Sequence, residues 1–303
     1  MSYTLLKTLI WLLIAFIVVA TGYFFGYQSG KQEQQVALIA ERQHSSELKK
    51  ALSKAQKMTA SHEYEKAPPR PPKRVQVIPE STREKPKLAI IIDDVSFAHD
   101  VRNVKALGLN LNLSFLPPSK RHPDSAKLAA REPFYMVHLP MEALSFASEE
   151  PHTLHVGDDA ETIKARVGEI KRLFPRVTYV NNHTGSRFTS DRPAMEKLLY
   201  ALDREGITFV DSRTTAKTAV PSLMQERHRP YLSRDVFLDH DPEVDSVKKQ
   251  IRRAVRIAKK YGTAIAIGHP HKKTLQGLAE SKAILKEVEL VRIDTLAADE
   301  KNE

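Results

Sequence analysis

The stretch Leu88-Ala-Ile-Ile-Ile-Asp-Asp94 places five apolar residues directly before two carboxylates. A short, uninterrupted apolar run is typical of a strand that is buried on both faces. In a barrel of parallel strands, the C-terminal ends of the strands form the rim that carries the active site. The sequence therefore predicts a buried strand that delivers Asp93 and Asp94 to such a rim.

Further apolar runs are also followed by polar and ionisable side chains. The polar groups that close them are His138 and Glu142, then Asn182, His183 and Ser186, then Asp211 and Ser212, then Arg234 and Asp239 around one short run, and finally His269 and His271. Random placement would scatter acids and imidazoles along the chain. Their position after six different runs indicates an enzyme with its site on one rim.

Between the runs lie stretches of helical character, so residues 87–295 read as one α/β domain with a parallel sheet. We expect a barrel of seven or eight parallel strands. An open, doubly wound sheet is the rival fold, but it gathers its site at one or two switch points. Strands are predicted at 87–92, 110–116, 133–138, 177–182, 207–211, 235–238, 263–267 and 287–293. Helices are predicted at 98–107, 123–131, 158–174, 191–205, 243–260 and 273–285, with a variable helical stretch at 213–228.

The N-terminal part has a different composition. Residues 8–30 carry no charge and are long enough to cross a bilayer, so residues 1–30 are predicted to be a retained single-pass anchor rather than a cleaved signal. Residues 31–66 read as a helical stalk with some capacity for weak self-association, and residues 67–86 as a Pro- and Lys-rich spacer. Residues 296–303 are expected to form a disordered tail. The short N-terminal tail favours a domain outside the inner membrane, on the periplasmic side.

The formal net charge is +10, and the first 86 residues hold 13 Lys and Arg against 7 Asp and Glu. This excess suits attraction to anionic lipid head groups or to an acidic wall polymer. An equally good interpretation is that the linker lysines simply keep that segment solvated. No nucleic-acid motif is present, so no nucleic-acid partner is expected. The absence of cysteine neither supports nor excludes export.

The donor types point to a metal. Carboxylates and imidazoles without a thiol suit a hard or borderline divalent cation, zinc best of all. The chain has no Gly-rich phosphate loop, no His-Glu-x-x-His helix and no nucleophile elbow. Structural roles compete with these interpretations: a helix cap for Asp93 and Asp94 or for Asp211 and Ser212, a satisfied core imidazole for His138, and an ion pair for Arg234.

Taken together and in order, six motifs resemble those of the divergent polysaccharide deacetylase family, a remote branch of the NodB-type carbohydrate deacetylases. The resemblance covers residues 86–294. Its motifs are Ile-Ile-Asp-Asp at 91–94, His-Leu-Pro-Met-Glu at 138–142, Asn-Asn-His-Thr-Gly-Ser at 181–186, Asp-Ser at 211–212, Arg-Asp-Val-Phe-Leu-Asp at 234–239 and Ile-Gly-His-Pro-His at 267–271. It implies a distorted (β/α) barrel and metal-dependent hydrolysis of an N-acetyl group on an envelope polysaccharide.

By this resemblance, Asp93 is the general base, Asp94 and His183 are metal ligands, and His269 or His271 is the general acid. Glu142 is a further catalytic candidate. The other polar groups of the motifs are candidates for substrate contacts: Asn182, Ser186, Asp211, Ser212, Arg234 and Asp239.

Two positions depart from the family pattern. Ser96 stands where the divergent branch has glycine, and Arg187 stands where the usual second motif has another histidine. The third metal ligand is therefore open, and His138 is our substitute. The departures also support a second hypothesis, in which the barrel is catalytically inactive and binds an envelope glycan or a protein partner.

Overall fold

The computed structural model describes residues 85–146 and 148–299. The predicted anchor and stalk and nearly all of the predicted spacer lie outside these residues, as do residues 300–303. Among the helices that the structure describes, none combines the length and the apolar character needed to cross a bilayer.

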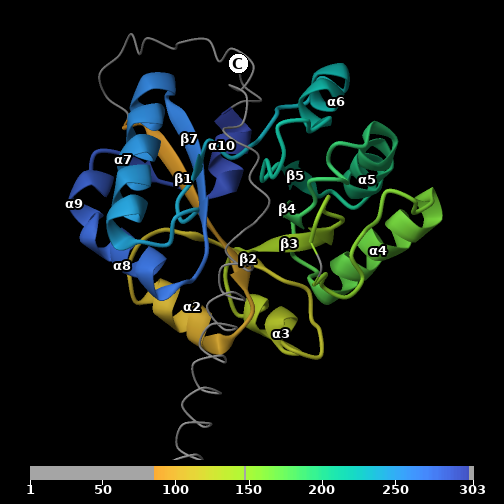
Figure 1. Ribbon diagram of the computed structural model, residues 1–303, viewed down its shortest axis with the longest axis horizontal. Coiled ribbons are helices and arrows are strands. Elements are labelled where there is room, and N and C mark those ends of the chain that lie inside the picture. The colour runs from red at the N-terminus through yellow and green to blue at the C-terminus, as the bar shows by residue number, and fades with distance from the viewer. Residues whose placement is uncertain (1–84, 147, 300–303) are drawn as a thin grey trace, which may run out of the picture. The chain divides into compact units, whose positions relative to one another are not determined.

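A sheet of eight parallel strands lies at the centre of the domain (Figure 1). Seven strands follow one another in the order β5-β4-β3-β2-β1-β7-β6, and β8 pairs with the beginning of β1. The strands are β1 (Lys87–Val95), β2 (Asn112–Phe115), β3 (Met136–Met141), β4 (Tyr179–Thr184), β5 (Thr208–Val210), β6 (Val236–Phe237), β7 (Thr263–Gly268) and β8 (Glu289–Leu290).

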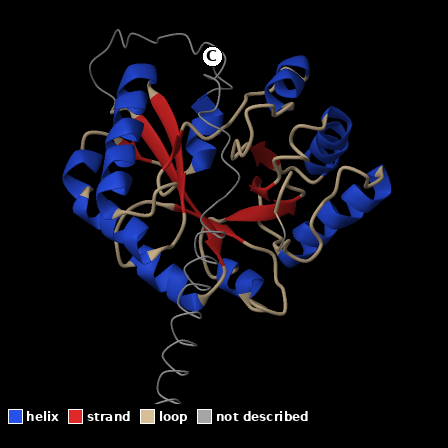
Figure 2. Cartoon of the chain, in the orientation of Figure 1, coloured by secondary structure: helices blue, strands red, loops and turns tan. Residues whose placement is uncertain are grey.

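Helices flank this sheet, and most of them connect one strand to the next (Figure 2). They are α2 (Ala98–Lys105), α3 (Ser125–Ala129), α4 (Ala160–Leu173), α5 (Arg192–Arg204), α6 (Val220–Glu226), α7 (Val244–Tyr261), α8 (Lys272–Glu280), α9 (Lys282–Leu285) and α10 (Ile293–Asp299). Capping side chains explain where two of the helices start. Asp159 before α4 and Asp191 before α5 each accept a hydrogen bond from a backbone N–H of the first turn. The helix predicted at 273–285 is divided into α8 and α9.

The C-terminal segment differs from its prediction. Residues 296–299 were expected in a disordered tail, but they belong to α10. Ile293 and Leu296 of this helix are buried against the inner face of β1 and β7. Apolar contact with the sheet is therefore the reason that the ordered domain extends beyond residue 295.

The sheet is strongly curved. Asn181 of β4 donates hydrogen bonds of 2.9 Å to both carboxylate oxygens of Asp93 in β1. Three inter-strand spacings separate these strands, which is about 14 Å in a flat sheet. The sheet must therefore curl until the two side chains meet. Beyond β5 and β6, an isolated parallel bridge joins Asp211 to Ser233. The arrangement is consistent with the predicted distorted barrel.

Strand β1 shows how the two faces differ. Ile90 and Ile92 pack in the large cluster with the helices, whereas Ala89 and Ile91 pack in a smaller cluster inside the curved sheet. Both clusters draw their buried residues from positions 88–296, and every ladder joins strands within residues 87–290. Residues 85–303 thus contain a complete core and a complete sheet, and we infer that this fragment folds on its own.

Three strands run further toward the rim than predicted. The predicted strands ended at residues 92, 138 and 182, but β1, β3 and β4 continue to Val95, Met141 and Thr184. The ladder between β3 and β4 pairs His138 with Asn181 and Pro140 with His183. The polar groups therefore lie within hydrogen-bonded strands rather than in the loops after them, and rigid backbone holds them in place.

Candidate functional site

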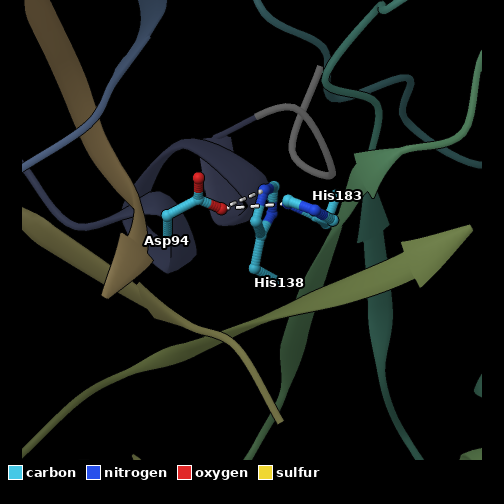
Figure 3. A group of neighbouring side chains, drawn as sticks. All are labelled: Asp94, His138 and His183. Atoms are coloured by element: carbon cyan, nitrogen blue, oxygen red, sulfur yellow. Dashed lines mark hydrogen bonds and ion pairs between the residues drawn. The ribbon is translucent and has the colours of Figure 1, made fainter. Parts of the chain in front are cut away.

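Three side chains from three strands meet at the rim (Figure 3). Asp94 comes from β1, His138 from β3 and His183 from β4, and one donor atom of each lies within 4.8 Å of the others. Asp94 Oδ1 is 2.9 Å from His183 Nδ1 and 3.4 Å from His138 Nε2. Both histidines are buried, while Asp94 retains partial exposure.

A turn of the backbone explains how two adjacent carboxylates reach one site. Alternation along β1 directs Asp93 to the inner face, as it does Ile91, and would direct Asp94 toward the helices. Asp94, however, has φ of 57°, in the left-handed region that few residues other than glycine adopt. The Ser96 hydroxyl donates to the Asp94 carbonyl at 3.0 Å and holds this turn. Both carboxylates therefore face the rim.

The three donors suit a divalent cation. Two ligands that each lie about 2.0–2.1 Å from a tetrahedral zinc ion are about 3.3 Å apart. The distances of 2.9 and 3.4 Å that surround Asp94 Oδ1 are close to this separation. Burial alone would raise the pKa of Asp94, but the neighbouring imidazoles, His183 foremost, hold it well below its usual range. Asp94 is therefore ready to bind a cation as a carboxylate.

Asp93 lies beside this trio in a polar cage. Its side chain is buried, and its Oδ2 is 3.6 Å from His138 Nδ1. Asn181, which binds both carboxylate oxygens, is itself held by Ser114 at 2.6 Å and by Ser212 at 3.0 Å. Burial raises the pKa of Asp93 to about 7, against the lowering effect of His269 and Asn181. A carboxyl group with such a pKa can accept a proton near neutral pH.

The structure separates the two histidines that the sequence left as alternatives. His269 is buried, and its Nε2 lies 3.8 Å from Asp94 Oδ2. His271 is exposed at the start of α8, and its ring stacks on that of His269 with centroids 5.5 Å apart. His269 is therefore the imidazole that joins the site.

Asp239 forms a hydrogen-bonded pair with His269 and orients its ring. Its Oδ1 lies 3.1 Å from His269 Nδ1, and its Oδ2 accepts the His269 backbone N–H at 2.6 Å and the Thr274 hydroxyl at 2.7 Å. Burial lowers the pKa of His269, but the charge and hydrogen bond of Asp239 raise it to about 9. His269 is thus protonated at neutral pH and can donate a proton.

Several predicted substrate residues line a small pocket next to these groups. The pocket is formed by Asp93, His138, Asn182, Thr184, Ser212, Thr214, Arg234, Phe237, Ile267 and His269. Arg234 donates to the carbonyls of Ser212 and Arg213 at 2.6 and 2.7 Å, and its guanidinium lies over the Phe237 ring. Asn182 accepts the Ser212 backbone N–H at 2.8 Å. These contacts shape the wall of the pocket.

Three other candidates are engaged elsewhere. The Glu142 carboxylate accepts the Val156 N–H and forms an ion pair with Arg187, each at 2.9 Å. Ser186 accepts the Leu144 N–H at 2.9 Å. Both hold the loop between β3 and α4.

Asp211 is the third of these candidates, and it has no exposed surface. Its carboxylate is occupied by the Arg213 N–H and by the hydroxyls of Thr218 and Tyr231. Asp211 therefore has a structural role, but not the predicted helix cap, because the next helix, α6, begins only after Ala219.

Asn181 is the functional residue that the sequence interpretation missed. It belongs to the Asn-Asn-His motif, in which the sequence predicts Asn182 as the candidate instead. Since β4 continues to Thr184, alternation places Asn181 on the same face as His183, two residues later. The strand period would have identified Asn181 if the strand had been predicted at its full length.

The chain is similar in sequence to known proteins. The model of a family described as divergent polysaccharide deacetylase matches residues 90–297. An uncharacterized protein of Haemophilus influenzae is 32% identical over 220 residues, which cover 71% of this chain and 78% of the relative. The Escherichia coli protein YibQ, also described as uncharacterized, is 32% identical over 196 residues, or 64% of this chain and 61% of the relative.

Among solved structures, an uncharacterized protein from Agrobacterium tumefaciens has a similar fold, with a TM-score of 0.62 at 21% identity. The match covers 72% of this chain and 92% of that one. At this level of identity the likeness establishes the fold alone.

Proposed function

Because the chain belongs to the divergent polysaccharide deacetylase family, we propose that it is a metal-dependent hydrolase that removes acetyl groups from the amino sugars of an envelope polysaccharide. One observation carries the proposal. On a single rim, the buried Asp93 carboxyl group lies 3.6 Å from His138 of the two-histidine, one-carboxylate trio, and the His269 imidazole lies 3.8 Å from Asp94 of the same trio. These are the parts that hydrolysis of an amide requires.

The residues divide the reaction between them. A divalent cation held by Asp94, His138 and His183 would polarise the acetamide carbonyl and make a water molecule more acidic. Asp93 takes the proton from the attacking water at its carboxylate, which Asn181 holds in position. His269 holds a proton at Nε2 and delivers it to the amine nitrogen as the C–N bond breaks. Asp239 keeps the His269 ring oriented and charged.

The choice of an envelope polysaccharide rests on the sequence of the N-terminal part. An uncharged run at residues 8–30, followed by a long polar segment, supports a domain that is tethered outside the inner membrane. The substrate would then be a glycan of the same compartment. Zinc is the cation that the donor set favours.

The reaction is tested by acetate release. The purified chain, loaded with zinc, is incubated with N-acetylated wall oligosaccharides, and acetate is measured over time. We expect release that a chelator abolishes and that added zinc restores. Failure of the zinc-loaded protein to release acetate from any of several glycans would refute the proposed activity.

The metal centre has a separate test. We expect about one zinc ion per chain, measured by titration calorimetry and elemental analysis. His183→Ala should abolish stoichiometric binding and leave the fold intact, because His183 lies at the rim rather than in the core. His99→Ala, at an exposed position of α2, is the matched control and should bind normally. Full zinc occupancy in His183→Ala would remove this residue from the site.

One observation favours a second function, a barrel that binds glycan without cleaving it. Arg187 occupies the position at which the related deacetylases have another histidine, and it is paired with Glu142 rather than with the trio. Under this hypothesis, wall oligosaccharides bind to the zinc-loaded protein but release no acetate. Binding calorimetry alongside the acetate assay distinguishes the two functions.

A further inference from the structure

One helix carries the positive charge of the folded domain. Helix α7 holds seven basic residues and one acidic residue, whereas the other residues of 87–303 hold 27 basic and 29 acidic residues. The sequence interpretation placed the basic excess mainly in the stalk and spacer. The domain, however, has its own concentration of basic residues in α7, and the rest of the domain is slightly acidic.

The charges of α7 are sorted by helical position. Five exposed cations fall within an arc of about 100° on the outer face: Lys249, Arg252, Arg253, Arg256 and Lys260. The opposite face packs into the core through Val247, Ile251, Ala254, Val255 and Ala258. The five cations define a straight row that is about 16 Å long. We refer to this row as the basic row.

Neighbouring acids neutralise the edges of the helix but not the basic row. Lys248 forms an ion pair with Glu280 of α8 at 2.9 Å, and Lys259 forms one with Glu287 at 2.8 Å. Within the described residues, no ion pair to an acidic side chain is found for the five cations of the basic row. Five neighbouring cations without an acidic partner repel one another, so an external anionic partner would stabilise them.

We propose that the basic row docks the domain on an anionic lipid surface. A helix face is convex, which suits a plane of head groups better than a single glycan chain, since small ligands and chains are usually held in concave sites. The uncharged run at residues 8–30 is long enough to cross a bilayer. Such an anchor would keep the domain close to the membrane surface. The apolar face of α7 is used by the core, so the contact is electrostatic and involves no insertion.

This docking leaves the active-site rim open. Helix α7 follows β6 and begins near the C-terminal ends of the strands, then runs back along the outside of the sheet to the start of β7 (Figure 1). A membrane in contact with the outer face of α7 would therefore lie beside the sheet rather than over the rim. The candidate metal site remains accessible to a polymer in the aqueous compartment.

Vesicle binding tests the proposal. The 85–303 fragment is sedimented with vesicles of phosphatidylcholine and phosphatidylglycerol, and with vesicles of phosphatidylcholine alone. We expect binding to the anionic vesicles only, and its loss at about 1 M salt, where the Debye length is about 3 Å. Binding to both kinds of vesicle, or to neither, would overturn the proposal.

Charge removal identifies the surface. Arg253→Gln combined with Arg256→Gln should weaken binding to anionic vesicles by about 30-fold. The matched control, Arg172→Gln with Arg204→Gln, removes the same charge from exposed positions of α4 and α5 and should have a much smaller effect. Equal losses in both variants would show that net charge, not the basic row, drives binding. Binding of the fragment to soluble polygalacturonate but not to the vesicles would replace the lipid with an acidic polymer.

The full chain provides a second readout. It contains no cysteine, so a single introduced cysteine accepts an environment-sensitive dye at one site only. Ser246→Cys lies beside the basic row and Tyr200→Cys lies on α5. After reconstitution into the two kinds of vesicle, the dye at position 246 should respond to anionic lipid, and the dye at position 200 should not. Identical responses at both positions would contradict docking through α7.

Discussion

At Asp93, burial and hydrogen bonding act in opposite directions on one carboxyl group. Burial raises its pKa to about 7, although His269 and the amide of Asn181 favour the charged form. The outcome is opposite at His269, where Asp239 outweighs burial and raises the pKa to about 9. Burial therefore decides the pKa of Asp93, whereas a charged partner decides the pKa of His269.

Replacement of Asp93 tests its role as the base. Asp93→Asn preserves the size of the side chain and removes the group that accepts the proton. We expect acetate release to fall by about 10²–10⁴-fold. Zinc content should remain at the wild-type value, because Asp93 is outside the ligand trio. Equal rates for wild type and variant would exclude Asp93 as the base.

Replacement of Asp239 tests the role of His269 as the acid. The rate should rise as Asp93 loses its proton and fall as His269 loses its own, which gives a bell-shaped profile. Asp239→Asn removes the negative charge that raises the pKa of His269. The alkaline limb should therefore move to lower pH. The measurement is the pH dependence of kcat/KM, and an unchanged alkaline limb would argue against this assignment.

At the scale of elements, the close approach of α7 and α8 is set by one glycine. A Cβ at Gly277 would lie 2.6 Å from Val247 Cγ1 and 2.9 Å from Val247 Cβ. Real Cβ contacts are longer than this, so any side chain at position 277 would push the two helices apart. The helix that carries the basic row is therefore held against the domain by a contact that only glycine permits.

The substitution Gly277→Ala tests this contact. In an open helix, alanine is favoured over glycine by roughly 0.5–1 kcal/mol. Here overpacking should reverse the sign and destabilise the fold by about 1–3 kcal/mol. Gly168→Ala in α4, where the nearest atom to the new Cβ is a flexible guanidinium nitrogen at 3.7 Å, is the control and should be neutral or stabilising. Urea denaturation of the two variants measures both effects. Stabilisation by Gly277→Ala would contradict the packing argument.

At the scale of the whole molecule, location determines which substrate the rim can meet. The uncharged run at residues 8–30 is long enough to cross a bilayer, and we propose that residues 31–303 lie outside the cytoplasmic membrane. A reporter enzyme that is active only after export, fused after Glu303, should be active. A second fusion to a reporter that works only in the cytoplasm should be silent. The reverse pattern would overturn this orientation.

Much of the domain could be predicted from the sequence because its signals are local. Continuous apolar runs predicted the strands of the parallel sheet, and the stretches between them predicted its helices. The order of the six motifs was sufficient for the family, which the comparison confirmed. Asp94, His138 and His183 were also named as the ligand trio from the sequence, and the structure brings the three together.

What only the tertiary structure decided depends on contacts between residues that are far apart in the chain. Curvature of the sheet brings Asn181 to Asp93, 88 residues away, and no local pattern encodes it. The same packing turns His269 toward the site and leaves His271 exposed, although they are two residues apart. The same packing directs the Glu142 and Asp211 carboxylates into contacts with neighbouring loops, where they bind Arg187 and Thr218. Sequence spacing specifies which groups reach the rim, whereas the direction of each group follows from the closure of the sheet around its interior.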